Sequence, residues 1–404
     1  MKYSDTMMIR DYKRVESFLK SNKKNLRVIN DRITKLRNNI SDSSINLLID
    51  DVEFIVMSFE MYYIACKNRK GLSQNFFNLT TFKRAIIMNV LIVFEKVKIM
   101  NDKNKSNKNI MGYYKEVQKY ADDIRYIRNE IEHAIDPHYR NEIENIDKKF
   151  NLDNQVEFVS CVVDFIDIYI LEKKEVNIRT ASIVESKFEN EYYKEKLQEK
   201  LYDSQIVFRN LNAISYEFEE FRNQSEAEII VDVLLKMVEY QNAFKEILDE
   251  NDEVRGHYLS RTINKKVYFQ KIALNICYQI FDKLGFYIND RYDMKIQKSY
   301  YKVVMDKLVM RDIKNDIIAN KIFQLNRNNS YKKISDLRNK WKHKFTKIEF
   351  NDISYDLNNL LIENYCNLIE VIKIISDEFI SKNNIPVTDE IIEEALSKQS
   401  YIEI

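Results

Sequence analysis

The chain has very little of what tight turns require. It contains 4 glycines and 2 prolines in 404 residues, far below the usage of ordinary globular proteins. β-Hairpins and β-sandwiches rely on these two residues where the chain reverses direction. The scarcity therefore predicts an all-α fold, in which helices are joined by short polar loops.

Paired cysteines are absent as well. The 4 cysteines are scattered at Cys66, Cys161, Cys277 and Cys366, with none of the short spacings of a zinc site or a disulfide framework. Unpaired cysteines are typical of a reducing compartment. We therefore expect a cytoplasmic protein without a structural metal, and the sequence indicates no cofactor.

No apolar run approaches the length of a membrane span, and the first residues, MKYSDTMMIRDYKR, lack the apolar segment of a signal peptide. The apolar share of 45% and the charged share of 31% are typical of a globular protein and not of a disordered one. The formal net charge is +1, so a nucleic-acid site would have to be a local basic patch. We expect no contact with a membrane.

One short pattern occurs twice. Residues 128–133 read RNEIEH and residues 338–343 read RNKWKH, so both fit the frame R-N-x-x-x-H and together hold two of the 4 histidines. The residue before each arginine is apolar, and so is the third residue after it. The repetition of the polar frame and of its apolar positions indicates two related units that share one chemistry.

A longer repeat surrounds the two motifs. Residues 82–97 resemble residues 269–284, and Tyr-Tyr-Lys at 113–115 recurs at 300–302, both with an offset of 187 residues. The two motifs themselves are 210 residues apart. The difference of about 23 residues predicts an added helix in the second unit, around 309–325.

The sequence therefore predicts two tandem, related helical-bundle units packed as a pseudo-dimer, at 1–180 and 188–380, followed by a C-terminal tail helix within 381–404. Amphipathic periodicity places helices of the first unit near 6–38, 43–68, 80–100, 110–134 and 154–173. Those of the second unit fall near 188–222, 225–250, 260–288, 296–325, 331–345 and 354–380. A short helix follows near 388–398.

Helix geometry separates the apolar and polar positions of the motif. At about 100° per residue, the two apolar residues share one face, while arginine, asparagine and histidine occupy the arc turned away from it. The other unit can dock on this polar face of the helix. If the polar faces of the two motif helices meet, they would form a cleft between the units. The candidate catalytic residues are Arg128, Asn129, His133, Arg338, Asn339 and His343.

These side chains are suited to RNA cleavage without a metal ion. A neutral histidine can accept the proton of a ribose 2′-OH, and a protonated histidine can donate one to the leaving 5′ oxygen. Arginine can neutralise the charge that grows on the phosphorane oxygens. Asparagine lies four residues before histidine, hence on the same face, and can orient the imidazole or the phosphate. DNA lacks the 2′-OH, so the reaction would be specific for RNA.

The surroundings of the two motifs differ in charge. Six lysines lie near the second motif, at 332, 333, 340, 342, 344 and 347, and four acidic residues lie near the first, at 122, 123, 130 and 132. The second motif is therefore better placed to attract a phosphate backbone, and we assign Lys340, Lys342 and Lys344 to substrate binding. Trp341 could stack a base, but its periodicity favours a place in the core.

The motif and its helical setting resemble the HEPN superfamily (higher eukaryotes and prokaryotes nucleotide-binding). Its catalytic members carry R-x4-H late in a small helical bundle, often with asparagine after the arginine. Both copies of the frame match this motif, and an acid stands in each preceding helix, at Glu95 and Asp282. The resemblance implies a metal-independent endoribonuclease whose site forms between two HEPN units, in a toxin, an abortive-infection protein or a CRISPR-associated nuclease.

Two hypotheses stay open. The first is this ribonuclease, acting on single-stranded RNA, with a regulatory or antitoxin partner as one arrangement. The second is a non-catalytic helical scaffold that binds RNA, a nucleotide or a partner protein with the same face. Both motifs retain histidine as well as arginine, which favours the enzyme because a binding surface needs only the positive charge. The sequence leaves open whether the units pair within one chain or between the chains of a homodimer.

Overall fold

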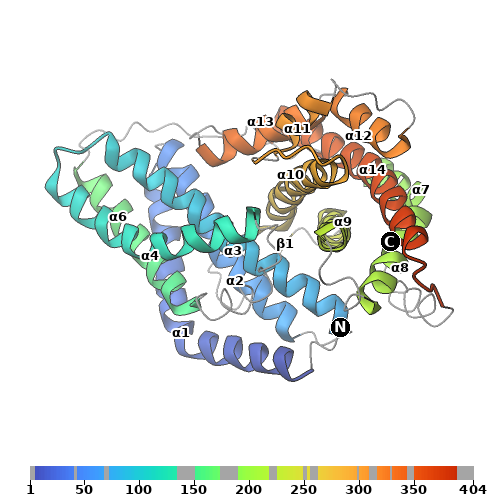
Figure 1. Cartoon of the computed structure of the whole chain (residues 1–404). Helices are drawn as coiled ribbons and strands as arrows, with labels where there is room; N and C mark the ends of the chain where they lie inside the picture. The colour runs from blue at the N-terminus through green and yellow to red at the C-terminus, as the bar shows by residue number, and fades with distance from the viewer. Residues whose placement is uncertain are drawn as a thin grey trace.

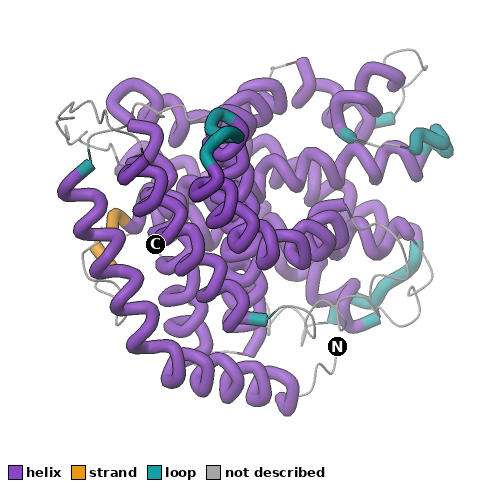
Figure 2. Tube along the Cα trace, turned by 90° about the vertical axis from the view of Figure 1, so that its left-hand side faces the viewer, coloured by secondary structure: helices purple, strands orange, loops and turns teal. Residues whose placement is uncertain are grey.

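The computed structural model of the chain is built almost entirely of helices, as Figure 1 and Figure 2 show. The described residues are 5–40, 43–67, 72–133, 151–172, 190–217, 225–248, 253–254, 263–297, 300–308, 316–327, 330–343 and 350–388. The all-α fold predicted from the scarcity of glycine and proline is confirmed. The one sheet within the described residues is a pair of two-residue strands.

Five described helices make up the first half of the chain. They are α1 (Asp5–Asn39), α2 (Ser43–Lys67), α3 (Leu72–Asp102), α4 (Lys108–His133) and α6 (Leu152–Glu172). The helix α2 packs along α3, α4 lies against α3 and α6, and α1 contacts α2 and α6. Residues 51–62 of α2 are all buried, because this helix lies in the middle of the group and is apolar on nearly every face.

The second half contains more described helices than the first. They are α7 (Asn190–Glu199), α8 (Leu201–Tyr216), α9 (Ser225–Leu248), α10 (Lys265–Arg291), α11 (Tyr301–Leu308), α12 (Ile317–Arg327), α13 (Ser330–His343) and α14 (Phe350–Lys382). The strands β1 (Glu253–Val254) and β2 (Ile263–Asn264) pair antiparallel before α10. The helix α9 packs along α10, α8 contacts α9 and α14, and α10 contacts α11 and α13.

The structure divides two segments that periodicity had predicted as single helices. The segment 188–222 breaks at Lys200 into α7 and α8, where the Lys200 ammonium pairs with Glu370 of α14. The segment 296–325 becomes α11 and α12, because Oδ1 of Asp316 accepts a hydrogen bond from the Ala319 amide at 3.0 Å and so starts a new helix. Neither break carries a glycine or a proline, so the residues that most often interrupt helices do not mark it.

Two further predictions of helix position need correction or stay open. The helix expected from 260 begins at 265, because 263–264 pair as a strand. A helix does lie in the inserted region, at Ile317–Arg327, near the added helix predicted at 309–325. Residues 385–388 are not helical, and the remainder of the predicted tail helix lies outside the described residues.

Equivalent positions of the sequence repeat make equivalent contacts. Phe94 stacks on Tyr114 with ring centroids 6.0 Å apart, and Phe281 meets Tyr301 edge-on at 5.0 Å. The members of both pairs correspond at the offset of 187. The exposed Tyr113 and its counterpart Tyr300 are each 38% exposed. The division into two related units stays a prediction, and these contacts are the observations that favour it.

The two halves meet where α3 packs against α9 and α13, and where side chains of α10 reach α2 and α3. The rings of Phe82 and Phe269 lie 6.2 Å apart, and these two residues are counterparts at the offset of 187. In a two-fold arrangement, only a residue that lies on the axis contacts its own counterpart. A pseudo-dimer would therefore place this pair on its axis. Close by, Oη of Tyr268 donates a hydrogen bond to Oγ of Ser58 at 2.8 Å. Figure 1 shows the first half mainly on the left of the molecule and the second half on the right.

A buried carboxylate lies at the same junction. The side chain of Asp51 is 2% exposed and pairs with Lys96 of α3, whose side chain is 3% exposed. It also pairs with Lys271 of α10 at 3.3 Å, and that ammonium lies 3.6 Å from the ring centroid of Phe54. Burial lowers the pKa of Lys271, and the negative charge of Asp51 opposes the shift. One carboxylate therefore neutralises cations from both halves.

We predict that Asp51→Asn destabilises the protein by about 3–5 kcal/mol, because removal of one partner leaves buried charges uncompensated. Asp102→Asn is the matched control: its carboxylate pairs with Lys105 at 3.3 Å but is 45% exposed, so the change should stay within about 1 kcal/mol. Urea denaturation followed by circular dichroism measures both effects. Equal stability of the two variants would contradict the importance of the buried pair.

Candidate functional site

The two motifs lie at the ends of corresponding helices. Arg128, Asn129 and His133 belong to the last turns of α4, and the second motif closes α13. The side chains of the first motif lie outside the described residues, as do those of His343, Trp341, Lys340 and Lys342, while Lys344 lies wholly outside them. The described part of the candidate site is therefore the beginning of the second motif, Arg338 and Asn339, with its surroundings.

Arg338 is buried, which corrects the prediction that it faces away from its own core. The residue is 6% exposed, and Nε donates a hydrogen bond to Oδ1 of Asn275 of α10 at 3.3 Å. Its guanidinium carbon lies 3.9 Å from the ring centroid of Tyr278 of the same helix. The guanidinium is thus held by a hydrogen bond and a cation–π contact, both from α10.

The correction has a simple geometric cause. Among the described side chains of α13, Ser330, Tyr331, Ile334 and Arg338 are buried. The last three follow one another at the three- and four-residue spacing of a helix face. Leu337, which the helix wheel had placed at the centre of the core face, is only partly buried. The buried face of α13 is therefore centred near Arg338 and not on Leu337. On the helix wheel this is a rotation of nearly one residue, or about 100°.

Asn339 lies where the prediction had placed it. It is exposed, and its Nδ2 lies 3.5 Å from Oγ of Ser335 one turn earlier. Lys332 and Lys333 are exposed near the start of the same helix. The described outer face of α13 is thus polar, with positive charge near its start.

An aromatic cluster supports the inner face of α13. Tyr331 stacks on Tyr278 with ring centroids 5.8 Å apart and contacts Phe281 and Tyr301 at 5.5 and 4.8 Å. Burial raises the pKa of Tyr331, and the negative charge of the buried Asp282 adds to the rise. The Tyr331 hydroxyl therefore stays protonated at neutral pH.

Asn275 and Tyr278 were not among the site residues predicted from the sequence. A signal for them existed, because they continue a stripe of polar or polar-tipped residues on an otherwise apolar helix: Tyr268, Lys271, Asn275, Tyr278 and Asp282, spaced three or four apart. The start of this stripe contacts the first half through Ser58 and Asp51. The same face of α10 therefore holds both the junction of the halves and the arginine of the second motif.

The second motif helix also reaches the first half directly. The helix α13 packs against α3 as well as against α10, α12 and α14 (Figure 1). Because α3 leads into α4, the chain segment that α13 touches is the one that precedes the first motif. Whether the two motifs meet lies outside the described residues.

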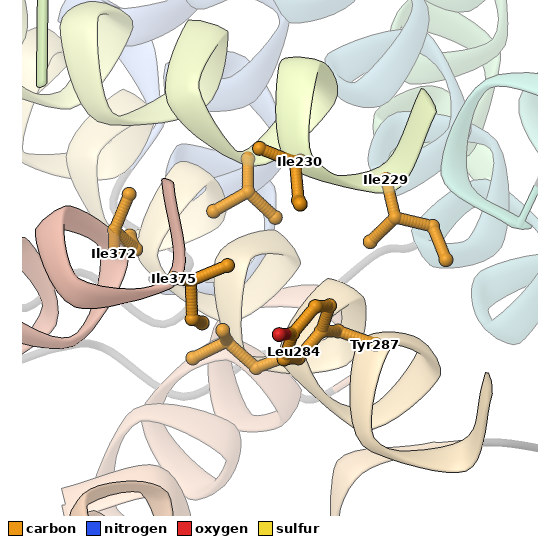
Figure 3. Close-up of a pocket in the computed structure, with 7 residues that line it drawn as sticks. Ile229, Ile230, Leu284, Tyr287, Ile372 and Ile375 are labelled. Atoms are coloured by element: carbon orange, nitrogen blue, oxygen red, sulfur yellow. The ribbon is translucent and has the colours of Figure 1, made fainter. Parts of the chain in front are cut away.

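A small hollow elsewhere in the second half offers no polar chemistry. It lies between α9, α10 and α14 and is lined by Ile229, Ile230, Val233, Leu284, Tyr287, Ile372 and Ile375 (Figure 3). The Tyr287 hydroxyl accepts a hydrogen bond from Arg291 at 3.1 Å. None of the lining residues belongs to α13, so we treat the hollow as imperfect packing of the core.

The described residues contain neither a candidate metal site nor a candidate membrane span. They contain no group of three or more His, Cys, Asp or Glu side chains placed to hold a metal ion. They also contain no helix long and apolar enough to cross a membrane.

Comparison with known proteins places the second half in a family. Residues 205–398 match the family model described as HEPN_Cthe2314-like HEPN, which spans α9 to α14, most of α8 and the second motif, but not the first. No curated protein matches the chain, and no solved structure does. HEPN domains have ribonuclease-type or nucleotide-binding functions in general. Residues 205–398, just under half of the chain, are therefore similar to HEPN domains of this family.

Proposed function

We propose that the protein is a metal-independent endoribonuclease whose site combines both R-N-x-x-x-H motifs. The proposal extends HEPN character to residues 1–180, which correspond to the second unit by the repeat at offset 187. The two units would then act as a pseudo-dimer within one chain. The substrate would be single-stranded RNA, which is the form whose 2′-OH and phosphate can be brought into line for attack.

One observation carries this proposal. Arg338 is held on α10 by Asn275, six residues after Phe269, which meets its own counterpart Phe82 of the first half. Six residues of helix span about 9 Å, so Arg338 lies close to the point about which the two units would be related. Under that relation the first motif approaches the same point from the other side, and a composite site follows.

The proposed roles follow from the chemistry of the side chains. His133 and His343 would share proton transfer, one accepting from the 2′-OH and the other donating to the leaving 5′ oxygen. Helical periodicity puts His343 four residues, about 40°, from the exposed Asn339. Asn129 and Asn339 would orient the histidine or the phosphate, and an arginine would offset the charge of the phosphorane.

The second hypothesis, a non-catalytic scaffold, is favoured by one observation. Arg338 is almost fully buried among α10 side chains, which is also what an arginine that only joins two helices would show. In that case the repeated R-N-x-x-x-H frame would serve helix packing, and the outer face of α13 would bind RNA, a nucleotide or a protein. A cleavage assay separates the two hypotheses, because only the enzyme cuts.

The biological setting is part of the proposal. HEPN ribonucleases in toxin or defence systems act on RNA inside the cell, and a partner that restrains the nuclease would fit such a role. We therefore propose a cytoplasmic RNA-cutting toxin or anti-phage defence protein. A second copy of the chain is required only if the two motifs of one chain do not meet.

We predict that the purified protein cuts labelled single-stranded RNA in the presence of EDTA. The products should end in a 2′,3′-cyclic phosphate or a 3′-phosphate, because the nucleophile is the neighbouring 2′-OH and not water. Gel analysis before and after phosphatase treatment identifies the ends. Activity that disappears on chelation and returns with Mg²⁺ or Mn²⁺ would rule out this mechanism.

We predict that His133→Ala and His343→Ala each lower the cleavage rate by about 10²–10⁴-fold, the usual cost of removing a general acid or base. Stability should be unchanged if both imidazoles face the cleft. His138→Ala and His257→Ala are matched controls, since these are the two histidines outside the frame. If the double variant of the motif histidines cuts as fast as the parent, only the scaffold hypothesis survives.

We predict that a combined Lys340/Lys342/Lys344→Ala change weakens binding to 2′-deoxy-substituted, uncleavable RNA. Loss of three phosphate contacts should lower the slope of log affinity against log salt by about 2 for a single strand. Lys23/Lys24/Arg27→Ala is the control, because it removes the same charge from exposed positions of α1. Equal salt slopes for the two triple variants would show that the basic residues of the second motif do not contact the backbone.

A further inference from the structure

The contacts of Arg338 come from two polar side chains in an apolar stretch of α10. Asn275 accepts the hydrogen bond at 3.3 Å, and Tyr278 presents its ring at 3.9 Å. Their neighbours Ala273, Leu274, Ile276 and Cys277 are all buried and non-ionic. Asn275 and Tyr278 are themselves half-buried. A polar group in such surroundings costs less desolvation when it is hydrogen-bonded, and Arg338 supplies a hydrogen bond to Asn275.

The corresponding positions of the first half differ in kind. At the offset of 187, Asn275 corresponds to Met88 and Tyr278 to Leu91. Both are 4% exposed in α3. A methionine thioether is at best a weak acceptor, and leucine has no acceptor and no ring. The first half therefore has no equivalent of the polar pair at these positions.

We infer that Asn275 and Tyr278 are positioning residues that fix the direction of Arg338 in the second motif. This inference rests on the proposed function. It assigns the second motif a role in stabilising the transition state through a fixed charge, since a preorganised group need not reorient during the reaction.

The inference differs from a purely structural role in what it predicts for kinetics. A residue that only fills the core affects activity in proportion to stability. A residue that aims a charge at the reacting phosphate affects the turnover number, while substrate binding, carried by other contacts, changes little. The first half suggests suitable substitutions for Asn275 and Tyr278. Their counterparts in α3, Met88 and Leu91, already pack in a buried helix of the same chain.

The experiment replaces residues of α10 by their counterparts in α3, in the full chain. Asn275→Met and Tyr278→Leu remove the acceptor and the ring. Tyr278→Phe keeps the ring. Cys277→Val is the matched control, because Cys277 is buried on the side of α10 that faces Tyr240 of α9 and its counterpart is Val90. Rates of RNA cleavage in EDTA, apparent KM and the urea midpoint are measured for each variant.

We expect Asn275→Met and Tyr278→Leu each to lower kcat about tenfold, in line with the loss of one contact to a charged group. KM should stay within about twofold of the parent, and the urea midpoints should match. Tyr278→Phe and Cys277→Val should cleave like the parent.

Three results would overturn the inference. Unchanged kcat in both Asn275→Met and Tyr278→Leu would show that the contacts do not position a reacting group. Losses that follow the urea midpoint, or that Cys277→Val reproduces, would show a structural role only. A parent protein that does not cut RNA would refute the proposed function, and the inference with it. The first two results, in contrast, are obtained with a parent that does cut RNA, so the two kinds of failure can be told apart.

Discussion

The junction of the two halves is the constraint on which the rest of the described structure depends. The two halves touch where α3 packs against α9 and α13, and where side chains of α10 reach α2 and α3. Their meeting point combines apolar contact, through Phe82 and Phe269, with a buried carboxylate that neutralises lysines from both sides. A buried charge tolerates neither separation nor sliding of its partners, so the junction sets the register in which the halves face each other.

The candidate site inherits its geometry from that junction. One face of α10 begins with the residues that contact the first half and continues, turn by turn, to the side chains that hold Arg338. Any displacement of α10 relative to the first half would therefore move the arginine of the second motif as well. This continuity explains how a motif at the end of a peripheral helix can be placed accurately: its position is determined by the most buried helix of its half.

Divergence between the halves is as informative as their likeness. The pairs Phe94–Tyr114 and Phe281–Tyr301 both join corresponding residues, although the first pair is stacked and the second is edge-on. Around the arginine, in contrast, the second half has Asn275 and Tyr278 where the first has Met88 and Leu91.

The sequence by itself determined the helical fold, the positions of most helices, and the repeat. These follow from local properties: the scarcity of glycine and proline, the period of apolar residues and direct similarity at one offset. It also indicated the HEPN superfamily, through a motif whose second copy lies in the part of the chain that matches the family model. The function and the catalytic roles of the six motif residues remain proposals.

Tertiary structure decided what local patterns leave undetermined. Periodicity states which residues share a helix face, but the neighbouring helix decides which face is buried. On α13 the aromatic cluster and Asn275 turn the core direction toward Arg338, so a charged residue lies inside while Leu337 is only partly covered. The breaks at Lys200 and Asp316 have the same origin, because they depend on partners far away in the sequence or on a single capping bond. Such choices depend on contacts that form only when the whole chain is folded.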